Sequence, residues 1–138
     1  MTQKITRIGL LGAAGRMGRE ITRQISERSD FEIGVALEQI GSSFLGIDSG
    51  DLAGVAPNGC LLTDSMDALL GEVDVLVDFT VPDSTIKTVK FCCKHNLPIV
   101  IGTTGLGDKL VSVTDSASKI PMVLAPNMSI GVNLSFKV

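Results

Sequence analysis

The stretch that decides the fold is Gly12-Ala13-Ala14-Gly15-Arg16-Met17-Gly18, a turn with the pattern G-x-x-G-x-x-G. It follows an apolar run, Ile8 to Leu11, that predicts a strand, and it precedes a stretch with helical spacing. Glycine at Gly12 permits a tight strand-to-helix turn, Gly15 lets a phosphate approach the main chain, and Gly18 lets the helix pack close to the sheet. The helix N-terminus offers N–H groups and a positive dipole end to a pyrophosphate. The alternative is a structural turn that binds nothing.

A second apolar run, Ile33 to Leu37, ends in Glu38, twenty residues past Gly18. A carboxylate at this distance is placed to accept hydrogen bonds from the adenosine ribose of a dinucleotide. The alternative is a solvated glutamate at a strand end. The next residue is Gln39, where an arginine often meets the 2′-phosphate of NADP. The sequence therefore favours NADH over NADPH.

Strands and helices are expected to alternate along the chain. The expected strands cover residues 5–11, 31–37, 61–62, 73–79, 99–101 and 122–125. Helices are expected after the glycine turn, at 65–70 with Asp64 as its cap, at 82–95 and at 108–119. This alternation predicts an α/β fold, a Rossmann-type doubly wound parallel sheet with helices on both faces. Residues 40–60 lack periodicity and are rich in Gly, Ser and Asp, as in a functional or mobile loop.

Small polar residues follow several of the expected strands. Because the carboxyl ends of parallel strands share one edge of a sheet, these side chains are expected to converge there. They offer hydrogen bonds to a nicotinamide ribose and carboxamide, while glycines beside them let the main chain approach a flat ligand. The alternative is that Gly and Thr simply populate turns. The residues concerned are Thr80, Thr103, Thr104, Asn127 and Ser129.

Composition indicates one globular domain: 138 residues, of which 44% are hydrophobic and 20% charged. No apolar run approaches the roughly 20 residues that span a bilayer, and the first residues have no signal-peptide pattern, so the cytoplasm is the expected compartment. The three cysteines, Cys60, Cys92 and Cys93, have neither a disulfide nor a zinc spacing and are expected to be packing residues. His95, the single histidine, is expected to sit at a helix end, and no metal site is expected.

The net charge of −3 is unevenly distributed. No Lys or Arg occurs between Arg28 and Lys87, whereas that interval carries many Asp and Glu residues. An acidic interval of this kind repels a phosphate backbone, so nucleic acid is not an expected partner.

Several blocks together make the whole chain similar to the bacterial dihydrodipicolinate reductases, also called 4-hydroxy-tetrahydrodipicolinate reductases. The resemblance implies an oxidoreductase of the diaminopimelate route to lysine, which reduces a cyclic unsaturated dicarboxylate with hydride from NADH or NADPH while water is lost. Members that favour NADPH often carry Arg after the ribose-binding Glu, so Gln39 again favours NADH. The blocks are the glycine turn, Gly41-Ser42-Ser43, Asp51-Leu52-Ala53-Gly54, Asp78-Phe79-Thr80, Gly102-Thr103-Thr104-Gly105 and residues 125–133.

The resemblance also implies which residues bind the cofactor. Gly12, Ala13, Ala14, Gly15, Arg16 and Met17 would hold the pyrophosphate, and Glu38 the adenosine ribose. Gln39, beside Glu38, is a further expected cofactor-binding residue. Phe79 and Thr80, at the end of the strand expected over 73–79, would also contact the cofactor. The nicotinamide side would be met by Gly102, Thr103 and Thr104, together with Pro126, Asn127, Met128 and Ser129. Thr104 is also expected to reach the substrate.

The family's catalytic segment, with paired histidines, a lysine and a Ser-Gly-Thr stretch, has no counterpart up to Val138. We therefore expect a fragment: a dinucleotide-binding domain over residues 1–127, and over 128–138 the start of a helix that leads into an absent substrate domain. No catalytic residue is expected in this chain, which would be inactive alone. The family forms homotetramers through the missing domain, so this piece could be a monomer.

Two other functions fit the same residues. One is a non-catalytic module that senses NAD(H), which would need no catalytic residues. The other is a different Rossmann dehydrogenase, such as one acting on homoserine or aspartate semialdehyde, because a fold does not determine a function. The blocks at 102–105 and 125–133 favour the reductase.

Overall fold

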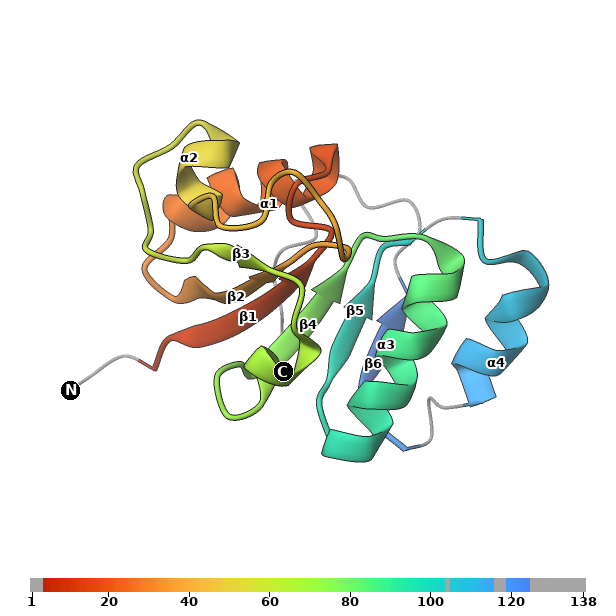
Figure 1. The fold of residues 1–138 in the computed structure, drawn as a ribbon. Coiled ribbons are helices and arrows are strands. Elements are labelled where there is room, and N and C mark those ends of the chain that lie inside the picture. Colours follow the sequence, from red (N-terminus) through yellow and green to blue (C-terminus); the bar gives the residue numbers. More distant parts are fainter. Residues whose placement is uncertain (1–3, 104, 116–118, 125–138) are drawn as a thin grey trace.

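The computed structural model describes residues 4–103, 105–115 and 119–124, which form one six-stranded sheet with helices on both of its faces (Figure 1). Neighbouring strands pair in parallel, in the order β3-β2-β1-β4-β5-β6. The order reverses between β1 and β4, which is where open α/β sheets bind their ligands. The strands are β1 (Thr6–Leu11), β2 (Phe31–Leu37), β3 (Leu62–Thr63), β4 (Val75–Asp78), β5 (Ile99–Ile101) and β6 (Met122–Leu124).

Helices α1 and α2 lie on one face of the sheet, and α3 and α4 lie on the other (Figure 1). This arrangement confirms the predicted doubly wound fold. None of the helices in the described part of the chain is long and apolar enough to cross a membrane. The helices are α1 (Arg16–Ser26), α2 (Ser49–Ala53), α3 (Pro82–His95) and α4 (Leu110–Asp115), with 3₁₀ turns η1 (Met66–Leu69) and η2 (Gly107–Lys109).

The sheet separates two hydrophobic cores. The core on the α1 side contains Ile21 and Ile25 of that helix, packed with Ile8 and Leu10 of β1. The core on the α3 side contains Leu11, Leu76, Val89 and Ile101, among others. Adjacent residues of β4, Leu76 and Val77, are both fully buried because they point to opposite covered faces. This double burial explains the uninterrupted apolar run from which a central strand was predicted.

The ends of α3 agree with the prediction, because Pro82 lies in its first turn and Asn96 ends it in a left-handed conformation with φ 56°. The prediction for β4 was too long. The Asp74 carboxylate accepts the N–H of Arg7 at 2.8 Å, so the ladder between β1 and β4 starts one residue later, with Ile8 opposite Val75.

Two predicted helices differ in the structure. The helix expected at 65–70 is the short 3₁₀ turn η1, and Asp64 is not its cap: the preceding residue is Ser65, and no side chain caps the turn. The helix expected at 108–119 is divided into η2 and α4, which ends at Asp115, and residues 116–118 lie outside the described residues.

Residues 40–60 contain a helix, α2, which the absence of periodicity did not indicate. The Asp48 carboxylate organises this segment by accepting four backbone N–H groups. Oδ1 accepts from Gly50 at 2.7 Å, Asp51 at 3.2 Å and Asn58 at 3.1 Å, and Oδ2 accepts from Gly59 at 2.8 Å. The segment is therefore a compact loop with its own hydrogen-bonded frame.

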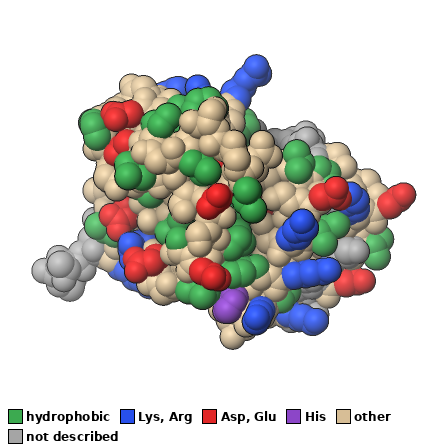
Figure 2. Space-filling view, viewed as in Figure 1, with side chains coloured by type: hydrophobic (Ala, Val, Ile, Leu, Met, Phe, Trp, Pro, Cys, Tyr) green, Lys and Arg blue, Asp and Glu red, His purple; other side chains and the backbone are tan. Residues whose placement is uncertain are grey.

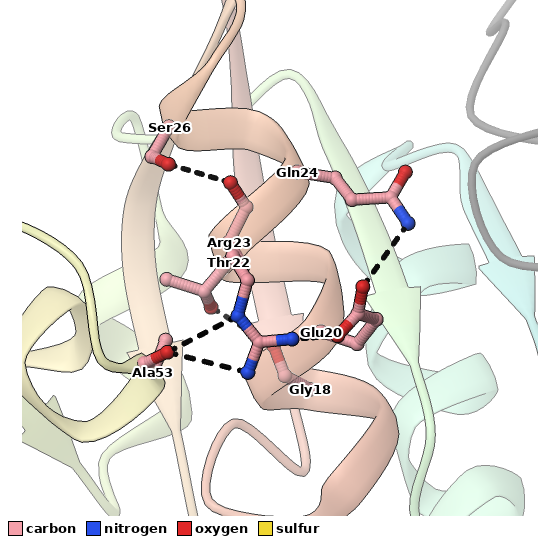
Figure 3. Close-up of polar contacts among 7 residues, drawn as sticks. All are labelled: Gly18, Glu20, Thr22, Arg23, Gln24, Ser26 and Ala53. Carbon is pink, nitrogen blue, oxygen red and sulfur yellow. Dashed lines mark hydrogen bonds and ion pairs between the residues drawn. The ribbon is translucent and has the colours of Figure 1, made fainter.

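Helix α1 holds this loop through Arg23 (Figure 3). The Arg23 guanidinium donates to the carbonyl of Ala53, the last residue of α2, with Nε and Nη2 both 3.4 Å from the oxygen. Glu20, one turn earlier on α1, pairs with the same guanidinium. The loop therefore packs against α1, the helix that begins at the glycine turn.

Candidate functional site

A cleft of about 830 Å³ opens at the carboxyl ends of β1, β2 and β4, where the strand order reverses. Its lining combines the glycine turn with the residues that follow β2 and β4. Six residues predicted from the sequence to bind a cofactor therefore share one cavity: Gly12, Gly15, Glu38, Gln39, Phe79 and Thr80.

The three glycines of the turn have different structural roles. Gly12 has φ 81°, and a Cβ there would lie 3.0 Å from the carbonyl carbon of Phe79, so a side chain is excluded by both conformation and space. A Cβ on Gly18 would lie 2.8 Å from the Cα of Ala13, which shows how closely α1 packs on the turn. A Cβ on Gly15 would meet only the Gly12 carbonyl, at 3.3 Å, and otherwise open space. Gly15 alone of the three therefore leaves room for a ligand.

The first turn of α1 has no side-chain cap, because its N-cap residue is Gly15. N–H groups at an uncapped helix start need an outside acceptor, and an anion is favoured by the helix dipole. Arg16 is exposed at the first helical position and Met17 is half-buried, whereas Ala13 is buried behind the turn. The open end of α1 can therefore hold an anionic group above Gly15.

Glu38 reaches from the end of β2 to the glycine turn. Its Oε2 accepts the N–H of Ala14 at 2.9 Å, and its Oε1 accepts the N–H of Gln39 at 3.1 Å. The turn is tied to β2 as well, because the N–H groups of Gly12 and Ala13 both donate to the Leu37 carbonyl at 3.1 Å. The carboxylate predicted to bind a ribose is thus fixed beside the turn predicted to bind a pyrophosphate.

Gly102 and Thr103, at the end of β5, lie against the loop that follows β4. The Gly102 N–H donates to the Asp78 carbonyl at 2.8 Å, and a Cβ on Gly102 would lie 2.6 Å from Cδ1 of the Phe79 ring. The Thr80 N–H donates to Thr103 Oγ1 at 3.2 Å. Thr104, Pro126, Asn127, Met128 and Ser129, also predicted site residues, lie outside the described residues.

The α3 side of the cleft was not predicted. Ser84, Lys87, Thr88 and Phe91 line it at helical spacing, and this spacing on a helix that starts at a strand end was the signal available in the sequence. Basic side chains, drawn in blue, gather over α3 and α4 (Figure 2). Lys87 of α3 lines the cleft, and the lining also contains the acids Glu38, Asp64 and Asp83.

His95, the last residue of α3, packs against the Phe91 ring with 4.5 Å between centroids. This places the single histidine at the helix end, as predicted. Within the residues that the structure describes, no three His, Cys, Asp or Glu side chains converge on a metal position.

The family model for the N-terminal part of dihydrodipicolinate reductase matches residues 6–128. The chain belongs to the dihydrodipicolinate reductase family. It is 44% identical over 135 residues to a 4-hydroxy-tetrahydrodipicolinate reductase of Chromohalobacter salexigens, with 97% of this chain and 50% of the relative covered. The reductase of the same name from Alkalilimnicola ehrlichii is 43% identical over 134 residues, with 96% and 50% covered.

Among solved structures, the chain resembles a dipicolinate-bound dihydrodipicolinate reductase from Paenisporosarcina sp. TG-14. The TM-score is 0.68 at 25% identity, and the likeness covers 89% of this chain and 48% of the other. The chain therefore spans about half the length of the curated reductases that it matches. The half that it spans is the one that the family model describes as N-terminal.

Proposed function

We propose that this chain is the cofactor-binding part of a 4-hydroxy-tetrahydrodipicolinate reductase and that its cleft binds a reduced nicotinamide dinucleotide. The observation that carries the proposal is the meeting of Gly15, Glu38 and Thr80 in one cleft, at the switch point of a sheet from this family. When bound, the cofactor supplies the hydride that reduces the cyclic dicarboxylate to tetrahydrodipicolinate, on the diaminopimelate route to lysine.

Each part of the cofactor has a partner of suitable chemistry. The residues from Gly12 to Met17 and the uncapped start of α1 take the pyrophosphate, since Gly15 leaves the main chain open. Glu38 accepts from the adenosine ribose hydroxyls, and the apolar lining farther along the cleft suits the adenine ring. Phe79 and Thr80 line the cleft on the nicotinamide side, and Gly102 and Thr103 support these two residues from outside the cleft lining.

NADH is the preferred cofactor in this proposal. A 2′-phosphate would lie beside the Glu38 carboxylate, and the neighbouring residue, Gln39, carries no positive charge to balance it. The same acidic lining favours a small-molecule ligand over nucleic acid. Lys87 is the lining residue that could partly offset the repulsion.

Substrate binding and catalysis are assigned to other parts of the intact reductase, apart from a contact from Thr104. His95 packs on Phe91 at the end of α3 and is not placed among the cleft's polar groups. In this proposal residues 1–127 are the dinucleotide-binding domain and 128–138 lead into the substrate domain. In this proposal the intact reductase is a homotetramer, whereas the present chain alone could be a monomer and binds dinucleotide without catalysing reduction.

The proposal is tested by titrating the chain with NADH and NADPH and following reduced-nicotinamide fluorescence, which has little protein background because the chain has no Trp or Tyr. We expect saturable binding that is tighter for NADH. Glu38→Gln keeps the size of the side chain and removes its charge, so it should weaken NADH binding and narrow the difference between the cofactors. No saturable binding of either cofactor would refute the proposal.

A further inference from the structure

The carboxyl group of Asp78 is fully buried at the end of β4, directly beneath the loop that lines the cleft. Among the residues that the structure describes, the donors from Thr80 and Thr103 all point to one oxygen of this carboxyl group. Oδ1 accepts from the Thr80 Oγ1 at 2.6 Å, from the Thr80 N–H at 3.0 Å and from the Thr103 Oγ1 at 3.4 Å. In the described part of the chain, Oδ2 has no hydrogen-bond partner.

This one-sided arrangement fits a neutral carboxyl group. An ionised carboxylate spreads its charge over both oxygens and needs donors at both, whereas a carboxyl protonated on Oδ2 leaves only one neutral O–H group unpaired. A buried charge with an unpartnered oxygen is far more costly than a buried neutral group. Burial also raises the pKa of the Asp78 carboxyl above its usual range, outweighing the Thr hydroxyl and amide donors that lower it.

The groups around Asp78 join two loops and a helix. Thr85, fully buried in the first turn of α3, donates from its Oγ1 to the Thr103 Oγ1 at 2.8 Å. Thr103 in turn accepts from the Thr80 N–H. The hydroxyls of the buried Thr85 and Thr103 and of the half-buried Thr80 thus form a cluster around Asp78. The hydrogen bonds of this cluster tie the loops after β4 and β5 together.

We propose that Asp78, protonated on Oδ2, is a positioning residue that orders Thr80 and Thr103 for the nicotinamide half of the cofactor without touching the cofactor itself. The inference rests on the proposed function, because the two loops are assigned to the nicotinamide side there. Its distinctive consequence is that Asp78 affects one half of the ligand. The adenosine half is held by Glu38 and the glycine turn, which are not part of the Asp78 cluster.

The experiment compares the affinity of the full chain for NADH with its affinity for ADP, which lacks the nicotinamide ring and its ribose. Asp78→Ala removes the acceptor, so NADH should bind on the order of tenfold more weakly while the affinity for ADP changes little. Asp78→Asn keeps an acceptor oxygen in a neutral group and should bind NADH within about threefold of the original chain. Thr85→Val should weaken NADH binding by a smaller factor than Asp78→Ala. Thr22→Val, the control, removes a similarly buried hydroxyl on α1 and should change the affinity for neither ligand.

A pH profile separates positioning by a neutral carboxyl group from simple packing. The strand neighbours of Asp78 in register are Leu11 and Ile101, which do not titrate. On α3, the Cys92 thiol interacts electrostatically with Asp78, and its own pKa is raised to about 12 by burial first, then by Cys93 and Asp78. The NADH affinity of the original chain should fall as the pH rises through the raised pKa of Asp78, and that of Asp78→Asn should not.

The outcomes are distinct. Equal weakening of NADH binding and ADP binding by Asp78→Asn or Thr85→Val, with the chain still folded, would overturn the inference and leave the proposed function standing. A pH profile shared by the original chain and Asp78→Asn would overturn it as well. If Asp78→Ala does not fold, Asp78→Asn and Thr85→Val still test whether Asp78 orders the loops on the nicotinamide side. Failure of the original chain to bind either ligand would refute the proposed function instead.

Discussion

Alanine at Gly18 and alanine at Gly15 should have opposite effects on stability and binding, although the residues are one helical turn apart. At Gly18 the new Cβ would overlap the Gly12 carbonyl oxygen and lie 2.8 Å from the Ala13 Cα. These are backbone atoms, so the overlap can be relieved only by moving α1 away from the turn. Overpacking of this kind costs about 1–3 kcal/mol or more. The gain of up to about 1 kcal/mol from replacing a helical glycine offsets only part of it.

At Gly15 the backbone has φ −73°, which alanine adopts without strain. The new Cβ would be 3.3 Å from the Gly12 carbonyl oxygen, so a shift of a few tenths of an ångström accommodates it. Losing glycine as the N-cap residue should destabilise the protein, and the lower entropy of the unfolded chain should stabilise it. Each contribution to the free energy of unfolding is below about 1 kcal/mol. The free energy of unfolding should therefore change by less than about 0.5 kcal/mol.

Urea unfolding followed by far-ultraviolet circular dichroism measures the stability of both variants, and NADH titration measures their binding. Gly18→Ala should lower the free energy of unfolding by about 1–2 kcal/mol. Gly15→Ala should remain as stable as the original chain but bind NADH at least about tenfold more weakly, because the methyl group occupies the space proposed for the pyrophosphate. Unchanged NADH affinity in a folded Gly15→Ala variant would refute the reasoning about the cradle.

Three further changes test other parts of the structure. Gly102→Ala should displace the Phe79 ring towards the cleft, lowering NADH affinity and costing about 1–3 kcal/mol of stability, measured in the same two assays. Asp48→Ala should lower the melting temperature by releasing four backbone N–H groups. Burial raises the pKa of Asp48, but the four N–H groups together outweigh it, so the pKa lies below its usual value. The stability that the ionised carboxylate contributes should therefore be lost as the pH falls through this lowered pKa. Unfolding of the original chain and of Asp48→Ala, measured over a range of pH, tests this expectation. Lys87→Gln should weaken NADPH binding more than NADH binding, and equal weakening would argue that Lys87 does not face the 2′-phosphate.

Short-range patterns were sufficient to predict most of the elements. The second strand, the first turn and end of α3, and β5 lie where alternation and capping residues placed them. The glycine spacing and the position of Glu38 correctly predicted neighbours across the end of the sheet, because a βαβ unit brings its two strand ends together. The helix α2 could have been predicted from Asp48 as an N-cap and Gly54 as the end of a helix.

The sequence by itself determined the class of fold, the order of strands and helices, and the strand end at which the candidate site lies, because these depend on periodicity and on turn residues a few positions apart. Only the tertiary structure decided which side chains share the cleft and which groups order it. The α3 lining at Lys87 and Phe91 depends on how a helix packs across the sheet. The pKa of the Asp78 carboxyl depends on burial and on donors from Thr80 and Thr103, up to 25 residues away, and no local pattern encodes that combination.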